Sequence, residues 1–176
     1  MVSKAQGKSM IKEIVERYRI VEKYPGLIKG LSEQDITTKF VLPMLDALNW
    51  DYRKITKDGP EVHEKAYREK SRVVKGLPDI QLESANGNVF VEVKKPPLRG
   101  QGMANLERYE DADLTILTSF EDLEVYTHDG KQKPRRRFKS NFKNYIEDFD
   151  RLWKILSNTQ EGKSSRAGYK STRKKA

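Results

Sequence analysis

The sequence predicts an α/β (α+β) fold in which helices flank a mixed central β-sheet. Apolar residues recur at every third or fourth position from Ser9 to Lys23 and again from Ser140 to Ser157, which predicts two amphipathic helices. Alternating apolar residues on either side of Asn86-Gly87 are typical of a β-hairpin and predict part of the sheet. A chain of 176 residues is long enough to bury one core, so we expect a single domain over residues 1–156.

A second helix is expected to begin after Ser32, because Asp35 stands three residues later and together they resemble a capping box. Pro43 falls within the apolar pattern of this helix. Its ring clashes with the preceding turn, so we expect it to kink or divide the helix. A strand is predicted from Trp50 to Thr56, followed by an irregular charged stretch up to Lys75.

The predicted hairpin turns at Asn86-Gly87 and ends at Pro96-Pro97, which cannot continue a ladder of hydrogen bonds. Side chains two residues apart on a strand project from the same face. Glu92 and Lys94 are therefore expected on one face of the sheet, with the alternating residues Val91 and Val93 facing the core.

Asp79 begins the partner strand and is expected to complete a cluster of two carboxylates and one ammonium with Glu92 and Lys94. Neighbouring carboxylates repel each other, and a hard divalent cation such as Mg²⁺ relieves that repulsion. Water bound to such a cation can attack a phosphodiester, with Lys94 orienting it or stabilising the developing negative charge. The alternative interpretation is structural: Asp79 starts a turn, and Glu92 pairs with Lys94 on a solvated strand face.

Beyond the hairpin, the pattern predicts a short helix after Gly102, strands over Leu114–Thr118 and Leu123–Tyr126, and the final helix over Ser140–Ser157. The apolar face of this last helix is expected to consist of Phe142, Ile146, Phe149, Trp153 and Leu156.

The composition excludes several classes of site. The chain has no cysteine, which rules out disulfides and thiolate zinc sites, and only two histidines. It has no apolar run long enough to span a membrane and no signal-peptide core, so we expect a cytoplasmic protein. The net charge of +9 indicates a polyanionic partner.

Much of this charge lies in residues 157–176, which carry six basic residues against the single acid Glu161. Glycine, serine and threonine separate these charges, and such a composition predicts a disordered tail. Two interpretations remain open for it. The tail is either an arm that follows DNA phosphates, or a solubilising tail or linker into further sequence.

Several segments together resemble the PD-(D/E)XK nuclease superfamily. Its signature is matched by Pro78-Asp79 followed by Glu92-Val93-Lys94. Over roughly Ile28 to Gly130 the chain is most similar to the N-terminal nuclease domain of type I and single-chain restriction-modification enzymes. The further segments that carry this resemblance are Ser32–Asp35, Phe40–Leu45, Leu48–Asp51, and Leu117–Phe120 through Tyr126.

The resemblance implies a restriction-endonuclease-like fold and a Mg²⁺ site at which Mn²⁺ substitutes. Asp79, Glu92 and the backbone carbonyl of Val93 would be metal ligands, and Lys94 the catalytic lysine. Glu33 matches a helix acid of the family that contacts a second metal or a metal-bound water. Its alternative role is electrostatic, because an acid near a helix N-terminus is favoured by the macrodipole.

One segment departs from the family pattern. Many of these nucleases carry Gln-x-x-x-Tyr after the catalytic hairpin, whereas this chain has Asn105 and Tyr109 at those positions. Residues four apart share a helix face, so both are expected to support the site. Gln101 in the preceding loop is a possible substitute for the missing glutamine, and Tyr109 has the alternative role of a half-buried core aromatic.

Basic residues near the site are candidate DNA contacts, because phosphate contacts need charge and reach more than fixed spacing. A solvated loop is the alternative for any of them. The candidates are Lys95, Arg99, Arg108, Lys131, Lys133, Arg135, Arg136, Arg137 and Lys139. No recognition helix or zinc finger is evident, so sequence specificity is expected from other domains.

These observations predict an Mg²⁺-dependent endodeoxyribonuclease, the cleavage module of a restriction or related defence system. Its partners would be DNA and the motor, methyltransferase or specificity domains of a larger enzyme. Two alternatives remain: a non-catalytic nucleic-acid-binding module on a nuclease fold, and a repair or junction-resolving nuclease of the same superfamily.

Overall fold

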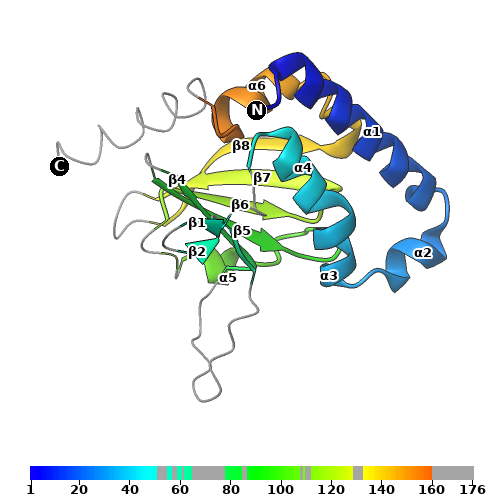
Figure 1. Cartoon of the computed structure of the whole chain (residues 1–176). Coiled ribbons are helices and arrows are strands. Elements are labelled where there is room, and N and C mark those ends of the chain that lie inside the picture. The colour runs from blue at the N-terminus through cyan, green and yellow to red at the C-terminus, as the bar shows by residue number, and fades with distance from the viewer. Residues whose placement is uncertain are drawn as a thin grey trace.

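A six-stranded mixed sheet forms the centre of the molecule in the computed structural model (Figure 1). The structure describes residues 1–50, 55–56, 59–60, 62–64, 78–84, 87–107, 109, 112–128 and 133–159. The strands follow one another in space as they do in the chain: β3 (Val62–Glu64), β4 (Ile80–Ser84), β5 (Gly87–Val93), β6 (Leu114–Thr118), β7 (Asp122–Thr127) and β8 (Arg135–Asn141). Two short strands, β1 (Ile55–Thr56) and β2 (Gly59–Pro60), form a separate antiparallel pair.

Among the described strands of the sheet, only β5 and β6 are parallel neighbours, and every other adjacent pair is antiparallel. Parallel strands need a crossover connection, and here it runs over residues 94–113 and contains the short helix α5 (Met103–Leu106). The backbone of Asn88 holds the far end of the crossover, since its N–H donates to Asp113 Oδ2 and its carbonyl accepts from Asp113 N.

Helices α1, α4 and α6 cover one face of the sheet, and α5 lies against the other (Figure 1). The main core combines side chains of the covering helices with β5 residues Val89, Val91 and Val93. Besides α5, the helical segments along the chain are α1 (Lys4–Glu22), α2 (Pro25–Gly30), α3 (Glu33–Ile36), the π-helix η1 (Thr37–Val41), α4 (Leu42–Ala47), the 3₁₀-helix η2 (Phe142–Asn144) and α6 (Phe149–Leu156). The predicted mixed sheet flanked by helices is confirmed.

The second predicted helix begins where the sequence indicates. The Ser32 hydroxyl accepts a hydrogen bond from Asp35 N, and Asp35 Oδ2 accepts one from Ser32 N, which completes the capping box. Hydrogen bonds from the Lys39 side chain and then from Ser32 hold the pKa of Asp35 well below its ordinary value.

Pro43 divides this helix, as predicted. The proline has no N–H to donate to the carbonyl four residues earlier, and the turn before it widens into the π-helix Thr37–Val41. The N–H of Leu42 reaches back five residues to the carbonyl of Thr37. The short α3 and its capped start are thereby separated from α4, which packs into the core.

The prediction of a strand starting at Trp50 was wrong at its first residue. Trp50 follows α4, is buried, and donates from Nε1 to the carbonyl of Leu156 over 2.7 Å. Within the charged stretch expected to be irregular, Val62–Glu64 forms β3 at the edge of the sheet. Gly87 is the first residue of β5 and pairs with Ser84, so it lies in the strand and not in the turn.

The predicted helix over Ser140–Ser157 was also wrong in its first half. Residues up to Asn141 belong to β8, whose Phe138 pairs with Val125 and whose Ser140 pairs with Leu123. A 3₁₀ turn follows, and the helix begins only at Phe149. The predicted apolar residues still reach the core: Phe142, Phe149, Trp153 and Leu156 are buried in it, and Ile146 is partly buried against it.

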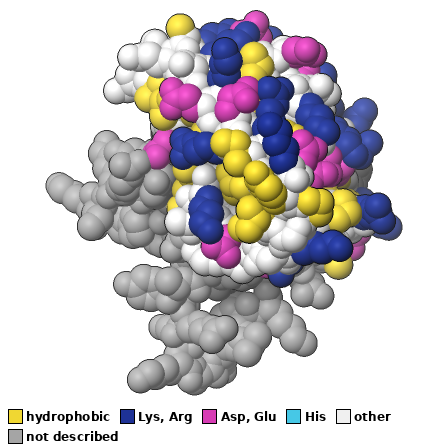
Figure 2. All heavy atoms as spheres, turned by 90° about the vertical axis from the view of Figure 1, so that its right-hand side faces the viewer, with side chains coloured by type: hydrophobic (Ala, Val, Ile, Leu, Met, Phe, Trp, Pro, Cys, Tyr) yellow, Lys and Arg dark blue, Asp and Glu magenta, His cyan; other side chains and the backbone are white. Residues whose placement is uncertain are grey.

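A patch of apolar side chains is exposed where α1 passes into α2 (Figure 2). Ile20, Tyr24 and Leu27 are each more than half exposed, and α2 buries none of its residues. In the part of the chain that the structure describes, no helix has the length and hydropathy to cross a membrane. The disordered tail was expected over residues 157–176, but Ser157 is buried and Asn158 N donates to the carbonyl of Leu48; residues 160–176 lie outside the described residues.

Candidate active site at the end of strand β5

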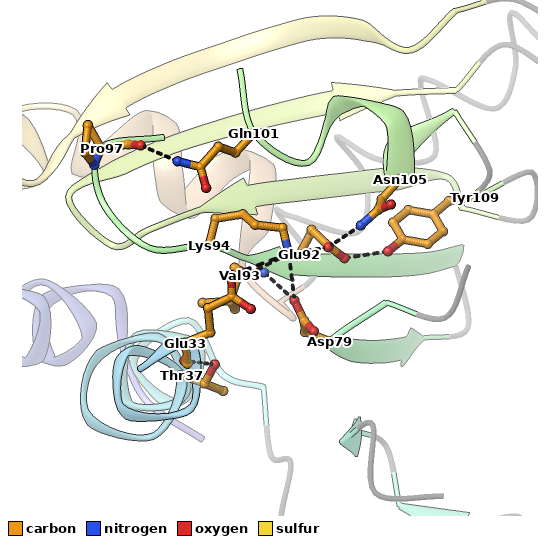
Figure 3. A network of polar contacts seen from close by, with 10 residues as sticks. All are labelled: Glu33, Thr37, Asp79, Glu92, Val93, Lys94, Pro97, Gln101, Asn105 and Tyr109. Carbon is orange, nitrogen blue, oxygen red and sulfur yellow. Dashed lines mark hydrogen bonds and ion pairs between the residues drawn. The ribbon is translucent and has the colours of Figure 1, made fainter. Parts of the chain in front are cut away.

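Strand β5 brings Glu92 and the adjoining Lys94 to one side of the sheet, as the strand parity predicts (Figure 3). Lys94 Nζ lies 2.6 Å from Glu92 Oε1. Val91 and Val93 are fully buried on the opposite side, in the main core. A packed row of valines therefore fixes the strand that carries the two charged side chains.

Asp79, the residue just before β4, lies beside this pair. Its Oδ2 atom accepts a hydrogen bond of 2.7 Å from Val93 N and lies 3.9 Å from Lys94 Nζ. The predicted convergence of Asp79, Glu92 and Lys94 is confirmed. Their meeting follows from the antiparallel pairing of β4 with β5, in which Ile80 opposes Val91.

Glu33 approaches the same ammonium from a different layer of the fold. It is the first residue of α3, and its Oε1 atom lies 3.9 Å from Lys94 Nζ. The capping box of α3 is made by Ser32 and Asp35, which leaves the Glu33 carboxylate outside the cap. The positive end of α3 and the Lys94 ammonium both favour an anion there, which agrees with the predicted electrostatic role; the predicted contact with a metal or its water stays a prediction.

The backbone carbonyl of Val93 also faces the site, since it accepts a hydrogen bond of 3.0 Å from Lys94 Nζ. One ammonium is thus surrounded by oxygen atoms of Glu33, Asp79, Glu92 and Val93. The Glu33 side chain is about half exposed (47%), whereas the Glu92 side chain is completely buried. The cluster therefore extends from the protein interior to the solvent.

Two side chains from the crossover hold the buried carboxylate of Glu92. Asn105 Nδ2 donates to Oε1 over 2.6 Å, and the Tyr109 hydroxyl donates to Oε2 over 2.5 Å. A buried charge is costly unless such groups satisfy it. Asn105 and Tyr109 were expected on one helix face, but α5 ends at Leu106 and Tyr109 follows it. Both nevertheless reach Glu92.

Tyr109 combines its two predicted roles. Its ring is buried and packs edge-on against Phe90 at 5.5 Å, while its hydroxyl serves Glu92. Gln101, given as a possible substitute for the glutamine of the family pattern, points elsewhere. Its amide donates to the carbonyl of Pro97, and Asn105 itself fills the supporting position.

Gly102 was not singled out from the sequence as a site residue, yet it forms a close wall of the site. Its φ of +81° lies in the left-handed region, which favours glycine. A Cβ atom built there would lie 2.6 Å from Leu117 Cδ1, 3.5 Å from Glu92 Cγ and 3.6 Å from Lys94 Cε. The Gly100-x-Gly102 spacing after two prolines was the available signal, since such a pattern indicates a tight loop.

The basic residues proposed as DNA contacts lie in two different settings. Lys95 and Arg99 are exposed in the crossover that starts at the site. Arg135, Arg136 and Arg137 belong to β8, so the alternative of a solvated loop was wrong for them. Arg108 and Lys131 lie outside the described residues, and Lys133 is exposed ahead of β8.

The charge of β8 is partly neutralised by Glu124 on the neighbouring strand. Arg136 Nη1 lies 3.4 Å and Lys139 Nζ 3.1 Å from Glu124 Oε1. The Tyr126 hydroxyl donates to the same carboxylate. Burial and then this hydrogen bond raise the pKa of Tyr126 to about 12. Arg137 Nε instead donates to Thr127 Oγ1.

The oxygen atoms around Lys94 are the hard donors that Mg²⁺ and Mn²⁺ prefer, so the residues fit such an ion by chemical type. As they stand, the acidic and histidine side chains of the described residues form no group of three that could hold a metal. The Lys94 ammonium lies between the carboxylates that would have to form such a group.

No family model, no curated protein and no solved structure matches this chain.

Proposed function

We propose that the protein is a Mg²⁺-dependent endonuclease that hydrolyses DNA phosphodiester bonds in the cytoplasm, as the cleavage module of a restriction or related defence system. The observation that carries the proposal is the convergence on Lys94 Nζ of Asp79, Glu92, Glu33 and the Val93 carbonyl. These groups come from α3, from the residue before β4 and from β5, and carboxylates that meet at one point repel each other unless a cation lies among them.

Each residue has a distinct task in this proposal. Asp79, Glu92 and the Val93 carbonyl would hold a divalent cation, which supplies an acidified water and neutralises phosphate charge. Lys94 orients the attacking water or stabilises the charge that develops on the phosphate. Asn105 and Tyr109 hold the Glu92 carboxylate in one orientation, which preserves the geometry of the site. Glu33, at the solvent side, would contact a metal-bound water or a second cation.

A polyanionic substrate agrees with the net charge of +9 and with exposed Lys95 and Arg99 in the segment that leads away from the site. Phosphate contacts of this kind position DNA without reading its sequence. We therefore propose that a motor, methyltransferase or specificity domain supplies the choice of sequence.

A non-catalytic binding module is the less favoured proposal. Such a module would gain nothing from three carboxylates that repel phosphate, one of them buried with both oxygens hydrogen-bonded. A repair or junction nuclease would use the same site on DNA of a different shape.

The test is incubation of purified protein with supercoiled plasmid DNA and Mg²⁺, Mn²⁺ or EDTA. Nicking or linearisation is expected with either metal and not with EDTA. Asp79→Asn is expected to abolish it, whereas Asp150→Asn, which removes an exposed carboxylate paired with Lys4 on the far side of the core, should cut at the parental rate. Metal-independent cutting, or equal cutting by both variants, would refute the proposal.

A further inference from the structure

Lys94 binds the same oxygen atoms that a divalent cation would need. Its ammonium contacts Glu92 Oε1 at 2.6 Å and the Val93 carbonyl at 3.0 Å. Asp79 and Glu33 each place a carboxylate oxygen 3.9 Å from it. We propose that Lys94 is an internal counter-ion of this site, which competes with the metal and must leave these oxygens when the metal binds. The inference rests on the proposed metal-dependent function and concerns how the site is loaded.

The hydrogen bonds of Glu92 leave little room for an alternative. Tyr109 occupies Oε2, and Oε1 is shared by Asn105 and Lys94. Because the carboxylate is completely buried and held at both ends, it cannot rotate to offer a metal another free oxygen. A cation bound to Glu92 would therefore use Oε1, from the side that the ammonium occupies.

The two cations cannot share these oxygens. Mg²⁺ binds oxygen at about 2.1 Å, so an ammonium that kept its contacts with the same two atoms would lie roughly 3 Å from it. At that separation two like charges in a partly buried site repel strongly. Lys94 must then withdraw from Glu92 Oε1 and from the Val93 carbonyl.

The structure gives Lys94 a direction in which to move. Its side chain is 16% exposed, and of its three carboxylate partners Glu33 is the one most open to solvent. Gly102 lies beside the aliphatic part of Lys94 and has no side chain to pack over it. A Cβ atom on Gly102 would lie 3.6 Å from Lys94 Cε. The ammonium is thus free to swing toward Glu33 and the solvent, where a DNA phosphate would provide it with a new partner.

This competition predicts a specific effect on metal affinity. Removing the ammonium while keeping the length of the side chain, in Lys94→Met, should tighten Mn²⁺ binding. We expect a dissociation constant at least about tenfold lower, because one charge-assisted hydrogen bond to Glu92 no longer opposes the metal. A lysine that acts only in the transition state would leave this constant unchanged.

The experiment is a titration of the DNA-free protein with Mn²⁺. Binding is measured by calorimetry and by the loss of the electron paramagnetic resonance signal of free Mn²⁺. Lys95→Met is the matched control, since it removes a neighbouring exposed lysine and the same net charge. The control should stay within about twofold of the parent, because an exposed charge is largely screened. Equal or weaker Mn²⁺ binding by Lys94→Met would overturn the inference.

Two further measurements keep the outcomes separate. If neither the parent nor Lys94→Met binds Mn²⁺, the proposed function itself fails. If Lys94→Met does not fold, crystals of the parent soaked with Mn²⁺ decide the matter. The Lys94 ammonium should then have left Glu92 Oε1, and a retained 2.6 Å contact beside bound Mn²⁺ would overturn the inference.

Discussion

Tyr109 donates a hydrogen bond to Glu92 Oε2 from a position seventeen residues further along the chain, and both residues are buried. The contact joins the crossover connection to the C-terminal end of strand β5. It also closes the one side of the Glu92 carboxylate that neither Asn105 nor Lys94 reaches.

Tyr109→Phe should therefore lower the free energy of unfolding by about 1–3 kcal/mol, the cost of leaving a buried charged acceptor with one partner fewer. Urea denaturation at neutral pH measures the change. Tyr24→Phe is the control, because Tyr24 is 58% exposed, and it should have no measurable effect. Equal stability of the two variants would mean that the Tyr109 hydroxyl does not support Glu92.

Gly102→Ala should destabilise the protein by about 1–2 kcal/mol, because it forces a side chain into the left-handed region against Leu117. Gly26→Ala is the matched substitution. Gly26 lies in α2, where a Cβ atom would meet nothing within 4 Å, so alanine should be neutral or stabilise by up to about 1 kcal/mol. Thermal denaturation of both variants tests the contrast, and a Gly102→Ala protein as stable as the parent would contradict it.

Lys94→Ala should abolish DNA cleavage while leaving DNA affinity close to that of the parent. In the proposed function this lysine acts on the attacking water and the developing charge, so its loss removes transition-state stabilisation. Single-turnover rates at saturating DNA and metal measure the first effect, and fluorescence anisotropy measures the second. Lys95→Ala should show the reverse pattern, and a parental cleavage rate for Lys94→Ala would exclude a catalytic role.

Arg99→Ala should weaken DNA binding more than Arg136→Ala. Arg99 is exposed, whereas Arg136 already pairs with Glu124 and has less charge to offer a phosphate. Loss of one full phosphate contact should reduce the slope of log affinity against log salt concentration by about 0.9. Binding constants over a salt series measure both slopes. The opposite order would place the DNA across β8.

Asp35 links the stability of the capping box at α3 to pH. Hydrogen bonds from Lys39 and then from Ser32 lower its pKa in the folded state, so their stabilisation is present above about pH 4 and is lost as the pH falls toward the folded pKa. Asp35→Asn should therefore show a smaller loss of melting temperature than the parent between about pH 5 and about pH 2. Glu13→Gln, an exposed change on α1, should keep the parental pH profile.

The parts of the site that depend on local geometry could be predicted from the sequence. Strand parity places Glu92 and Lys94 together, and the Ser32–Asp35 spacing defines the start of α3 beside Glu33. The approach of Glu33 to the Lys94 ammonium could not be derived from these local patterns and was suggested only by the resemblance, because it depends on how closely α3 packs beside the end of β5.

The error at β8 has the same physical origin. Residues from Ser140 onward fit a helical period, but Ser140 and Phe138 pair with Leu123 and Val125 of β7. That pairing with the preceding strand outweighs the local helical preference. Likewise, α5 stops at Leu106, and the position of Tyr109 is set by its contacts with Phe90 and Glu92 and not by helical spacing.

The crossover between the two parallel strands also has a consequence for the order in which the site is expected to form. The β4–β5 hairpin can form early from neighbouring residues, but it leaves Glu92 in water without its amide and hydroxyl partners. Burial of this carboxylate has to wait until the chain has returned through α5 and β6 has docked in parallel, a contact of longer range that forms more slowly. We therefore expect the charged cluster to gain its buried partners only after the crossover has closed on β5.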